Sequence, residues 1–168
     1  RRGRVGVGLR ELRGRVAAGD VGARAQLEEA VREVLLFMPR PGAPTQFRRQ
    51  FPPTRWACEF NAALTMPFFR WLVGPSKVVE VEVGGLRQRS EVHIEKCRYL
   101  ESSGCVGMCV NMCKVPTQDF FTNEFGLPLT MNPSDAYFED MSCEMIYGQV
   151  PPPLEEDPAL KQACYPSL

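Results

Sequence analysis

The segment from Cys97 to Cys113, CRYLESSGCVGMCVNMC, restricts the fold more than any other part of the chain, because it holds four of the seven cysteines. Its sulfur-bearing residues follow the i, i+3, i+4, i+7, i+8 spacing of one helical face: Cys105, Met108, Cys109, Met112 and Cys113. An N-cap at Ser102 or Ser103 would satisfy the first free amides of such a helix. We therefore expect a helix with a stripe of sulfur, around which the rest of the chain is arranged.

A disulfide within this stripe is disfavoured, because helical side chains four residues apart run roughly parallel rather than toward each other. Metal binding is the functional alternative, since thiolates are soft ligands for iron, zinc or copper(I). A tetrahedral ion holds its sulfurs at about 2.3 Å, whereas Cys105 and Cys113 would lie about 12 Å apart along a helix. One ion would thus require a break in the helix, for which Gly104 and Gly107 are suited.

An iron–sulfur cluster is wider than one ion and could be reached from two helical turns, with help from Cys97 or Cys143. The spacing nevertheless differs from the short C-x-x-C motifs of common ferredoxins and zinc ribbons. The structural alternative is a set of reduced core cysteines, because free cysteine packs as a small apolar residue. From the residues alone, both interpretations stay open.

The charge pattern argues against a nucleic-acid partner and predicts a basic arm at the N-terminus. The formal net charge of the 168 residues is zero, but residues 1–55 contain twelve arginines and only five acidic residues. Residues 1–19 are rich in Arg and Gly, as a partner-bound or mobile arm would be. The alternative is the remnant of an Arg-rich leader followed by an ordinary solvated helix. We expect residues 20–168 to form one domain.

The cysteine count and the termini favour a reducing compartment inside a cell. Seven is an odd number and no secretory signal precedes the cysteines, which disfavours an extracellular disulfide scaffold. Because the chain begins at Arg1 rather than at Met, we expect a removed organelle transit peptide. No run of about 18 uncharged apolar residues occurs, so no transmembrane helix is predicted.

Two helices are predicted before any strand. Residues 20–38 have one apolar face, and residues 39–53, with five prolines, are expected to form an extended connector. A second helix is expected from a Thr54 cap to the Gly74-Pro75 stop, with a kink at Pro67. Its aromatic residues predict core packing, a pocket for a long apolar ligand or shallow contact with a membrane. The pocket candidates are Trp56, Phe60, Phe68 and Trp71.

The remaining elements predict an α+β fold, in which N-terminal helices pack on a small antiparallel sheet closed by the cysteine-rich helix. Residues 77–83 and 86–96 flank Gly84-Gly85 as a hairpin does. His93 would share a solvated face with Glu91 and Glu95, which makes it a weak ligand candidate. A short helix should start at Pro116 and stop at Gly126, followed by extended chain over 127–131. Strand 141–147 would then direct Cys143 toward the sulfur stripe.

Two long motifs resemble a known family: CRYLESSGCVGMCVNMCKVPTQDFFTNEFGLPLTMNP and FEDMSCEMIYGQVPPP. They look like the carotenoid isomerase family whose founding member is called dwarf twenty-seven, and the similarity extends over roughly residues 27–168. It implies an iron-dependent plastid protein, soluble or peripheral to a membrane, that interconverts all-trans- and 9-cis-β-carotene. In that family this reaction is the first step toward strigolactone hormones.

The family's cysteines correspond here to Cys97, Cys105, Cys109, Cys113, Cys143 and Cys164, and we take the first five as metal-ligand candidates. Two departures from the family are visible. Residues 134–137, SDAY, look like a small insertion, and a cysteine that often follows Cys-Tyr in the family is absent after Tyr165. Either departure is what a divergent branch would show.

The resemblance leaves two mechanisms and two non-catalytic roles open. Thiolate-bound iron could move one electron to give a polyene radical that rotates freely. Alternatively, a buried acid with a raised pKa could protonate the polyene, for which the candidates are Glu101, Asp119 and Glu124. The chain could instead be a fixed, non-catalytic or iron–sulfur subunit of a plastid (thylakoid) membrane complex, or an iron–sulfur electron carrier.

Overall fold

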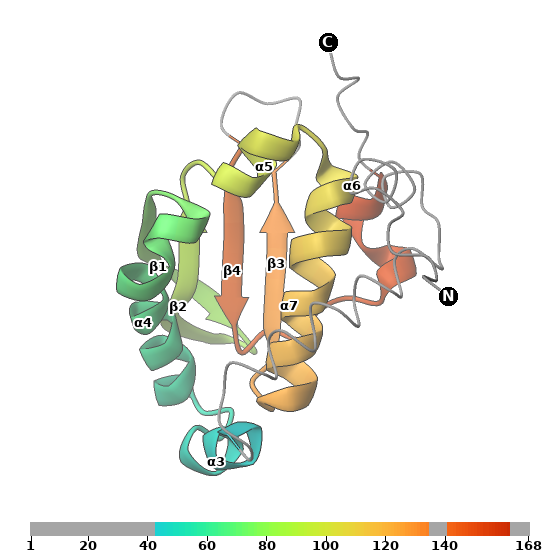
Figure 1. Cartoon of the computed structure of the whole chain (residues 1–168). Coiled ribbons are helices and arrows are strands. Elements are labelled where there is room, and N and C mark those ends of the chain that lie inside the picture. Colours follow the sequence, from blue (N-terminus) through green and yellow to red (C-terminus); the bar gives the residue numbers. More distant parts are fainter. Residues whose placement is uncertain (1–42, 135–140, 162–168) are drawn as a thin grey trace, which may run out of the picture.

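The computed structural model describes residues 43–134 and 141–161. The predicted basic arm at 1–19, the predicted helix at 20–38 and Cys164 lie outside these residues. Within them the fold is α+β, as predicted, with helices packed on an antiparallel sheet (Figure 1). No helix in the described residues is long and apolar enough to cross a membrane.

Four strands form one sheet in the order β1-β2-β4-β3, and every neighbouring pair is antiparallel. The strands are β1 (Ser76–Val83), β2 (Leu86–Ile94), β3 (Leu129–Pro133) and β4 (Cys143–Tyr147). Residues directly opposite each other share a face, so Val92 and Met145 point to one side while His93 and Glu144 point to the other. The first side carries the hydrophobic core.

The β1–β2 hairpin confirms the turn prediction. Gly84 and Gly85 have φ values of 59° and 78°, the left-handed conformation that a two-residue hairpin turn requires and that glycine adopts without strain. The predicted strand over 141–147 is confirmed from Cys143 onward. The predicted extended segment after Gly126 becomes β3.

Helix α3 (Ala43–Gln50) corrects the prediction of an extended connector over 39–53. Pro44 lies in its first turn, where a missing N–H group costs nothing, and no proline follows until Pro52. Two contacts fix this helix to the segment around Glu124 and Phe125. The Phe47 and Phe125 rings stack with centroids 4.1 Å apart, and the Arg48 Nε donates to the Glu124 carbonyl at 2.7 Å.

Helix α4 (Arg55–Val73) begins and ends where the sequence predicts. The Thr54 hydroxyl accepts from the Ala57 N–H, and Gly74 ends the helix with φ of 108°. A side chain at Gly74 would meet the Lys96 carbonyl oxygen, so glycine is required for close approach as well as for conformation. The buried face of α4 packs on the sheet through Ala57, Cys58, Asn61, Ala62 and Thr65.

The cysteine-rich segment is two helices rather than one. Helix α5 (Arg98–Ser103) ends at Gly104, whose left-handed φ of 57° turns the chain. A new helix then runs over 106–124 through α6 (Val106–Cys109), η1 (Val110–Lys114), α7 (Val115–Asp119) and η2 (Phe120–Glu124); we call residues 106–124 the cysteine helix. The predicted cap at Ser102 or Ser103 is therefore wrong, and Cys105 is the N-cap.

Pro116 lies inside the cysteine helix instead of starting another, which corrects a second prediction. Pro116 has no N–H to donate to the preceding turn, and that turn widens to a π-helix in which the Val115 N–H bonds the Val110 carbonyl. The short 3₁₀ helices η3 (Leu154–Glu156) and η4 (Pro158–Lys161) close the described chain, with η4 against α6.

Candidate functional site

Four thiols from three parts of the chain lie close to one another, two of them on the cysteine helix. Cys97 follows β2, Cys109 and Cys113 lie one turn apart on the cysteine helix, and Cys143 begins β4. All four are free thiols, and three of them are buried while Cys113 is half-buried. Each of Cys109, Cys113 and Cys143 is close enough to feel the charge of at least one other member. We call these four residues the thiol cluster.

The thiol cluster disfavours negative charge unless a cation is present. Burial raises the pKa of Cys109 and of Cys143 well above the ordinary value, and it raises the pKa of Cys113 to about 11. Neighbouring thiolates raise these pKa values further, while the Lys114 ammonium lowers those of Cys109 and Cys143. Cys109, Cys113 and Cys143 are therefore protonated at neutral pH, and a bound metal would have to displace their protons.

The spacing of the sulfurs discriminates between kinds of metal site. In the described part of the chain, no three of these sulfurs lie mutually within 4.8 Å. A single tetrahedral ion with metal–sulfur bonds of about 2.3 Å would need them about 3.8 Å apart. Soft, buried donors that do not converge on one small ion are compatible with a wider iron–sulfur cluster.

Cys105 does not belong with the other four ligand candidates. It is disulfide-bonded, and its sulfur accepts from the Met108 N–H at 3.4 Å as the helix cap. The αL turn at Gly104 is the physical reason, because it directs Cys105 out of the helical stripe. Of the five predicted metal ligands, the structure therefore brings four together and separates one.

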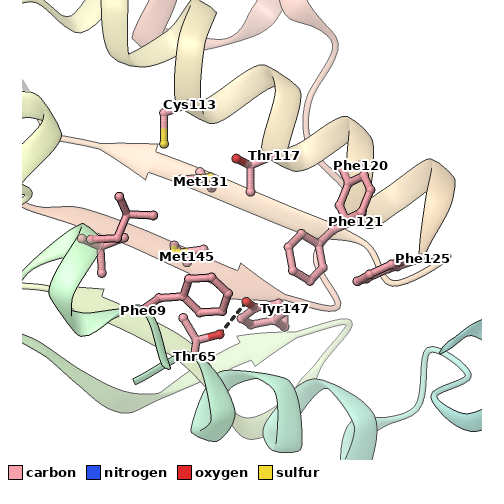
Figure 2. Close-up of a pocket in the computed structure, with 12 residues that line it drawn as sticks. Thr65, Phe69, Cys113, Thr117, Phe120, Phe121, Phe125, Met131, Met145 and Tyr147 are labelled. Atoms are coloured by element: carbon pink, nitrogen blue, oxygen red, sulfur yellow. Dashed lines mark hydrogen bonds between the residues drawn. The ribbon is translucent and has the colours of Figure 1, made fainter. Parts of the chain in front are cut away.

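An apolar cavity of about 280 Å³ lies between α4 and the cysteine helix, with the sheet as its floor (Figure 2). Its walls are mainly aromatic and aliphatic: Thr65, Phe69, Leu72, Val73, Cys113, Thr117, Phe120, Phe121, Phe125, Met131, Met145 and Tyr147. Phe69 and Leu72 are 43 % and 52 % exposed, so the cavity reaches the surface along α4. Cys113 belongs to both the wall of this cavity and the thiol cluster.

The polar side chains that line the cavity already form hydrogen bonds within the protein. The Tyr147 hydroxyl and the Thr65 hydroxyl are 2.8 Å apart, and the Thr65 hydroxyl lies 2.8 Å from the Asn61 carbonyl that it donates to. Burial raises the pKa of Tyr147 to about 12, so this phenol stays neutral. The Thr117 side chain is likewise hydrogen-bonded to the Cys113 thiol. An apolar ligand could therefore enter the cavity without leaving many polar groups of the wall without a hydrogen bond.

The predicted aromatic pocket residues lie elsewhere on α4. Trp56, Phe60, Phe68 and Trp71 do not line the cavity, and their exposed fractions are 59 %, 39 %, 63 % and 70 %. The helix instead contributes residues at positions i, i+4, i+7 and i+8: Thr65, Phe69, Leu72 and Val73. That spacing is present in the sequence, but the prediction was based on the larger aromatic residues of the neighbouring helix face.

The three predicted acid candidates are not at the cavity. Glu101 is exposed and pairs with Lys96 at 2.7 Å, and Asp119 is exposed and accepts from Asn123. Glu124 is half-buried near the end of the cysteine helix. None of them lines the apolar cavity.

The surroundings of His93 differ from the predicted solvated face. Glu95 lies beyond the end of β2 and pairs with Lys77 at 3.3 Å. Glu91 is buried, its Oε1 is 3.8 Å from His93 Nδ1, and Glu144 faces both from β4. Burial, and then the Glu144 charge, raise the pKa of Glu91. Glu144 could not be predicted from the sequence, because its proximity to His93 depends on the pairing of β2 with β4.

Comparison with known proteins agrees with the resemblance seen in the sequence. Residues 71–156 match the family described as "Beta-carotene isomerase D27-like, C-terminal". A protein of Medicago truncatula named "Beta-carotene isomerase D27, chloroplastic" is 54 % identical over 118 residues, which cover 70 % of this chain and 46 % of that protein. Its Arabidopsis thaliana namesake is 50 % identical over 115 residues, covering 68 % and 42 %.

No solved structure matches the chain. The chain spans less than half the length of these two relatives. The matched residues contain the thiol cluster, the four-stranded sheet and the whole cysteine helix. The chain therefore belongs to the D27-like beta-carotene isomerase family.

Proposed function

We propose that this chain is the catalytic part of a plastid enzyme that interconverts all-trans- and 9-cis-β-carotene, with iron bound by the thiol cluster. The observation that carries the proposal is the double position of Cys113. Its side chain is a member of the thiol cluster and also part of the cavity wall. A hydrocarbon in the cavity would therefore lie next to thiolate-bound iron. The names of the relatives support both the substrate and the compartment.

The residues that would hold iron are Cys97, Cys109, Cys113 and Cys143. Iron held there would supply reversible one-electron chemistry for the polyene, with no net consumption of electrons. The Lys114 ammonium lowers the pKa of Cys109 and Cys143 and thereby favours the thiolate form that binds metal. The donor spacing supports a cluster rather than a single ion.

The cavity residues would bind and orient the polyene and keep water away from it. Phe120, Phe121 and Phe125 present ring faces and edges to the interior (Figure 2). A volume of about 280 Å³ is just below the range of about 300–1,000 Å³ that is usual for ligand pockets. A C40 polyene is larger than that, so one part of it would occupy the cavity and the remainder would follow the surface of α4.

Protonation of the polyene is the less well supported mechanism. It requires a buried acid beside the substrate with a pKa raised by its apolar surroundings. In the described part of the chain, no carboxyl group lines the cavity. The phenol of Tyr147 is there, but its hydrogen bond to Thr65 and its pKa of about 12 make it a poor acid. Electron exchange through the thiol cluster is therefore the mechanism we propose.

We also propose that the exposed face of α4 contacts the lipid surface of a plastid membrane. Six large apolar side chains on this one helix are 40 % exposed or more: Trp56, Leu64, Phe68, Phe69, Trp71 and Leu72. Trp and Phe are the residues that insert most readily at a lipid interface. Two of these six line the cavity, and a β-carotene substrate would be dissolved in lipid. The helix face would thus join the membrane to the cavity.

The test of the proposed function compares cysteine variants of the whole protein, purified without oxygen. We expect Cys113→Ser and Cys143→Ser to lose bound iron and to reduce β-carotene isomerisation at least tenfold, as measured by chromatography of the isomers. Cys58→Ser is the matched control, because Cys58 is also a buried free thiol but lies on α4 outside the thiol cluster. Full activity in an iron-free preparation would reject the role of iron.

A further inference from the structure

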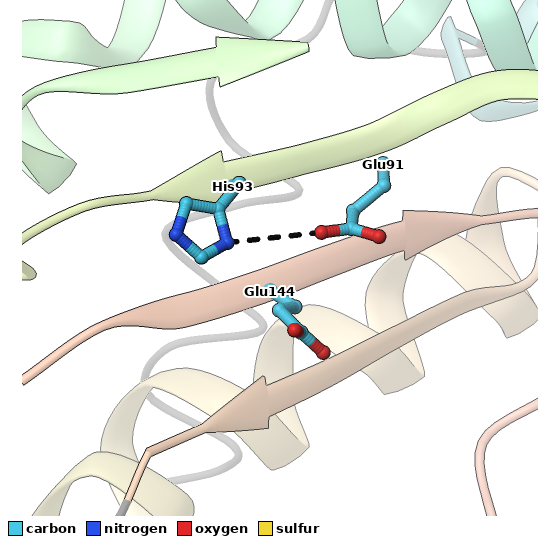
Figure 3. Close-up of side chains that lie close together, drawn as sticks. All are labelled: Glu91, His93 and Glu144. Carbon is cyan, nitrogen blue, oxygen red and sulfur yellow. Dashed lines mark ion pairs between the residues drawn. The ribbon is translucent and has the colours of Figure 1, made fainter. Parts of the chain in front are cut away.

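A second group of ligand-type side chains lies on the opposite face of the sheet from the cavity. Glu91 and His93 are two residues apart on β2, and Glu144 is directly opposite His93 on β4. Their ligand atoms all lie within 4.8 Å of one another. Figure 3 shows the Glu91 carboxylate directed toward the His93 ring, with Glu144 beside them on the neighbouring strand. Met145 lines the cavity, so its neighbour Glu144 must point away from it.

This group has two carboxylates and one imidazole, and in the described residues neither Lys nor Arg pairs with the two carboxylates. Glu91 is 8 % exposed, and its Oε1 lies 3.8 Å from His93 Nδ1, a contact that is an ion pair only when the imidazole is protonated. Lys77 pairs with His93 across β1 and β2, but its ammonium is 3.3 Å from the Glu95 carboxylate. The Glu91 and Glu144 carboxylates lie close enough to repel each other, and a cation bound between them would remove that repulsion.

We propose that Glu91, His93 and Glu144 bind a divalent transition-metal ion, distinct from any metal at the thiol cluster. Two residues at i and i+2 on one strand and one residue opposite them give three ligands on one face, the number that leaves positions open for water. One imidazole and two carboxylates suit Mn²⁺, Fe²⁺ or Zn²⁺, whereas Mg²⁺ and Ca²⁺ prefer oxygen alone. His93 and Glu144 are half-buried, which leaves an entry path from solvent.

The bound ion would connect the two central strands of the sheet. Strand β2 is followed by Cys97 and strand β4 begins with Cys143, so the ion would hold together the two strands that carry half of the thiol cluster. This inference does not depend on the proposed isomerase activity. It concerns other residues, the opposite face of the sheet and harder ligands than thiolate.

Manganese is the probe, because Mn²⁺ favours oxygen and nitrogen over thiolate. We would titrate the whole protein, with its thiol cluster loaded, with Mn²⁺ and follow the loss of the free-ion electron paramagnetic resonance signal. The expected result is one Mn²⁺ per chain, with affinity at least tenfold weaker in Glu144→Gln and in His93→Gln. Glu95→Gln is the control, because Glu95 is a nearby exposed carboxylate outside the group.

A thermal unfolding series keeps the test decisive if a variant folds poorly. Mn²⁺ should raise the melting temperature of the wild type and of Glu95→Gln, because it binds only the folded state. The same ion should leave Glu91→Gln and Glu144→Gln unchanged. Absence of bound Mn²⁺ in the wild type would overturn the proposal. Equal Mn²⁺ affinity in the wild type, in Glu144→Gln and in His93→Gln would also overturn it.

Discussion

Lys114 and Asp157 form a fully buried ion pair, with the ammonium 2.7 Å and 2.5 Å from the two carboxylate oxygens. Their side chains are only 1 % and 4 % exposed. Lys114 follows Cys113 on the cysteine helix, and Asp157 lies between η3 and η4, where it also accepts from the Ala159 N–H. The pair therefore fixes the end of the described chain to the helix that carries two members of the thiol cluster.

Removing one partner of this pair should be strongly destabilising. Asp157→Ala would leave the Lys114 ammonium buried without a counter-ion, and such changes cost about 3–5 kcal/mol. The measurement is the free energy of unfolding from denaturant titration. Glu156→Ala is the matched control, since Glu156 is the exposed neighbouring residue. Equal stability of the two variants would show that the ion pair contributes nothing.

Filling the cavity should impair carotene isomerisation without affecting metal binding. Val73 lines the cavity at the end of α4, and Val73→Phe would add a ring to a space of about 280 Å³. We expect isomerisation to fall at least tenfold while iron content stays at the wild-type level. Val150→Phe is the control, because Val150 is 70 % exposed and outside the cavity. Unchanged turnover in Val73→Phe would place the substrate elsewhere.

Charge on the exposed face of α4 should weaken binding to lipid. In the variant Phe68→Glu/Trp71→Glu, two side chains that are 63 % and 70 % exposed become charged, so folding should be little affected. We expect much less co-sedimentation with vesicles of plastid lipids. Leu86→Glu is the control, as Leu86 is 63 % exposed on the β1–β2 hairpin. Equal vesicle binding, or co-migration of the wild type with a large pigment complex, would favour a protein partner for this face.

The contact between α4 and β2 should weaken in acid through Glu59. Its carboxylate accepts from the Arg89 N–H at 3.1 Å and from Arg55 at 3.0 Å, and these two bonds lower its pKa below the ordinary value of 4.5. A lowered folded-state pKa means that this stability is present above about pH 4.5 and is lost as the pH falls through the folded-state pKa.

Glu59→Gln should therefore flatten the dependence of melting temperature on pH in the acid range. The effect should be small, since the carboxylate is close to solvent and surface pairs contribute little. Glu82→Gln, at an exposed position on β1, should leave the curve unchanged. Identical acid curves for the wild type and Glu59→Gln would contradict the assigned contact.

Local signals explain what the sequence could predict about the fold. The β1–β2 hairpin depends on Gly84-Gly85, and helix α4 on a cap at Thr54 and a stop at Gly74; each acts on neighbouring residues. The helical stripe was predicted only in part, because Gly104 ended one helix before the next began and so removed Cys105 from the stripe. A glycine near a helix end can be recognised, but whether it interrupts depends on packing.

Contacts between distant elements explain what the sequence could not predict. Cys143 was expected near the sulfur stripe from strand parity alone, but that Cys97 joins the same group depends on how β2 leads into α5. Glu144 meets His93 only because β2 and β4 are neighbours in the sheet. The cavity follows from the rotation of α4, which turns Phe69 inward and Trp71 outward.

The central claim is that four convergent thiols bind an iron–sulfur cluster beside the apolar cavity. X-ray absorption at the iron edge, on the whole protein purified without oxygen, tests it most directly. We predict a first shell of sulfur only, together with iron–iron scattering, and the loss of both in Cys113→Ser. A first shell of nitrogen and oxygen, or a spectrum that is unchanged in that variant, would contradict the account.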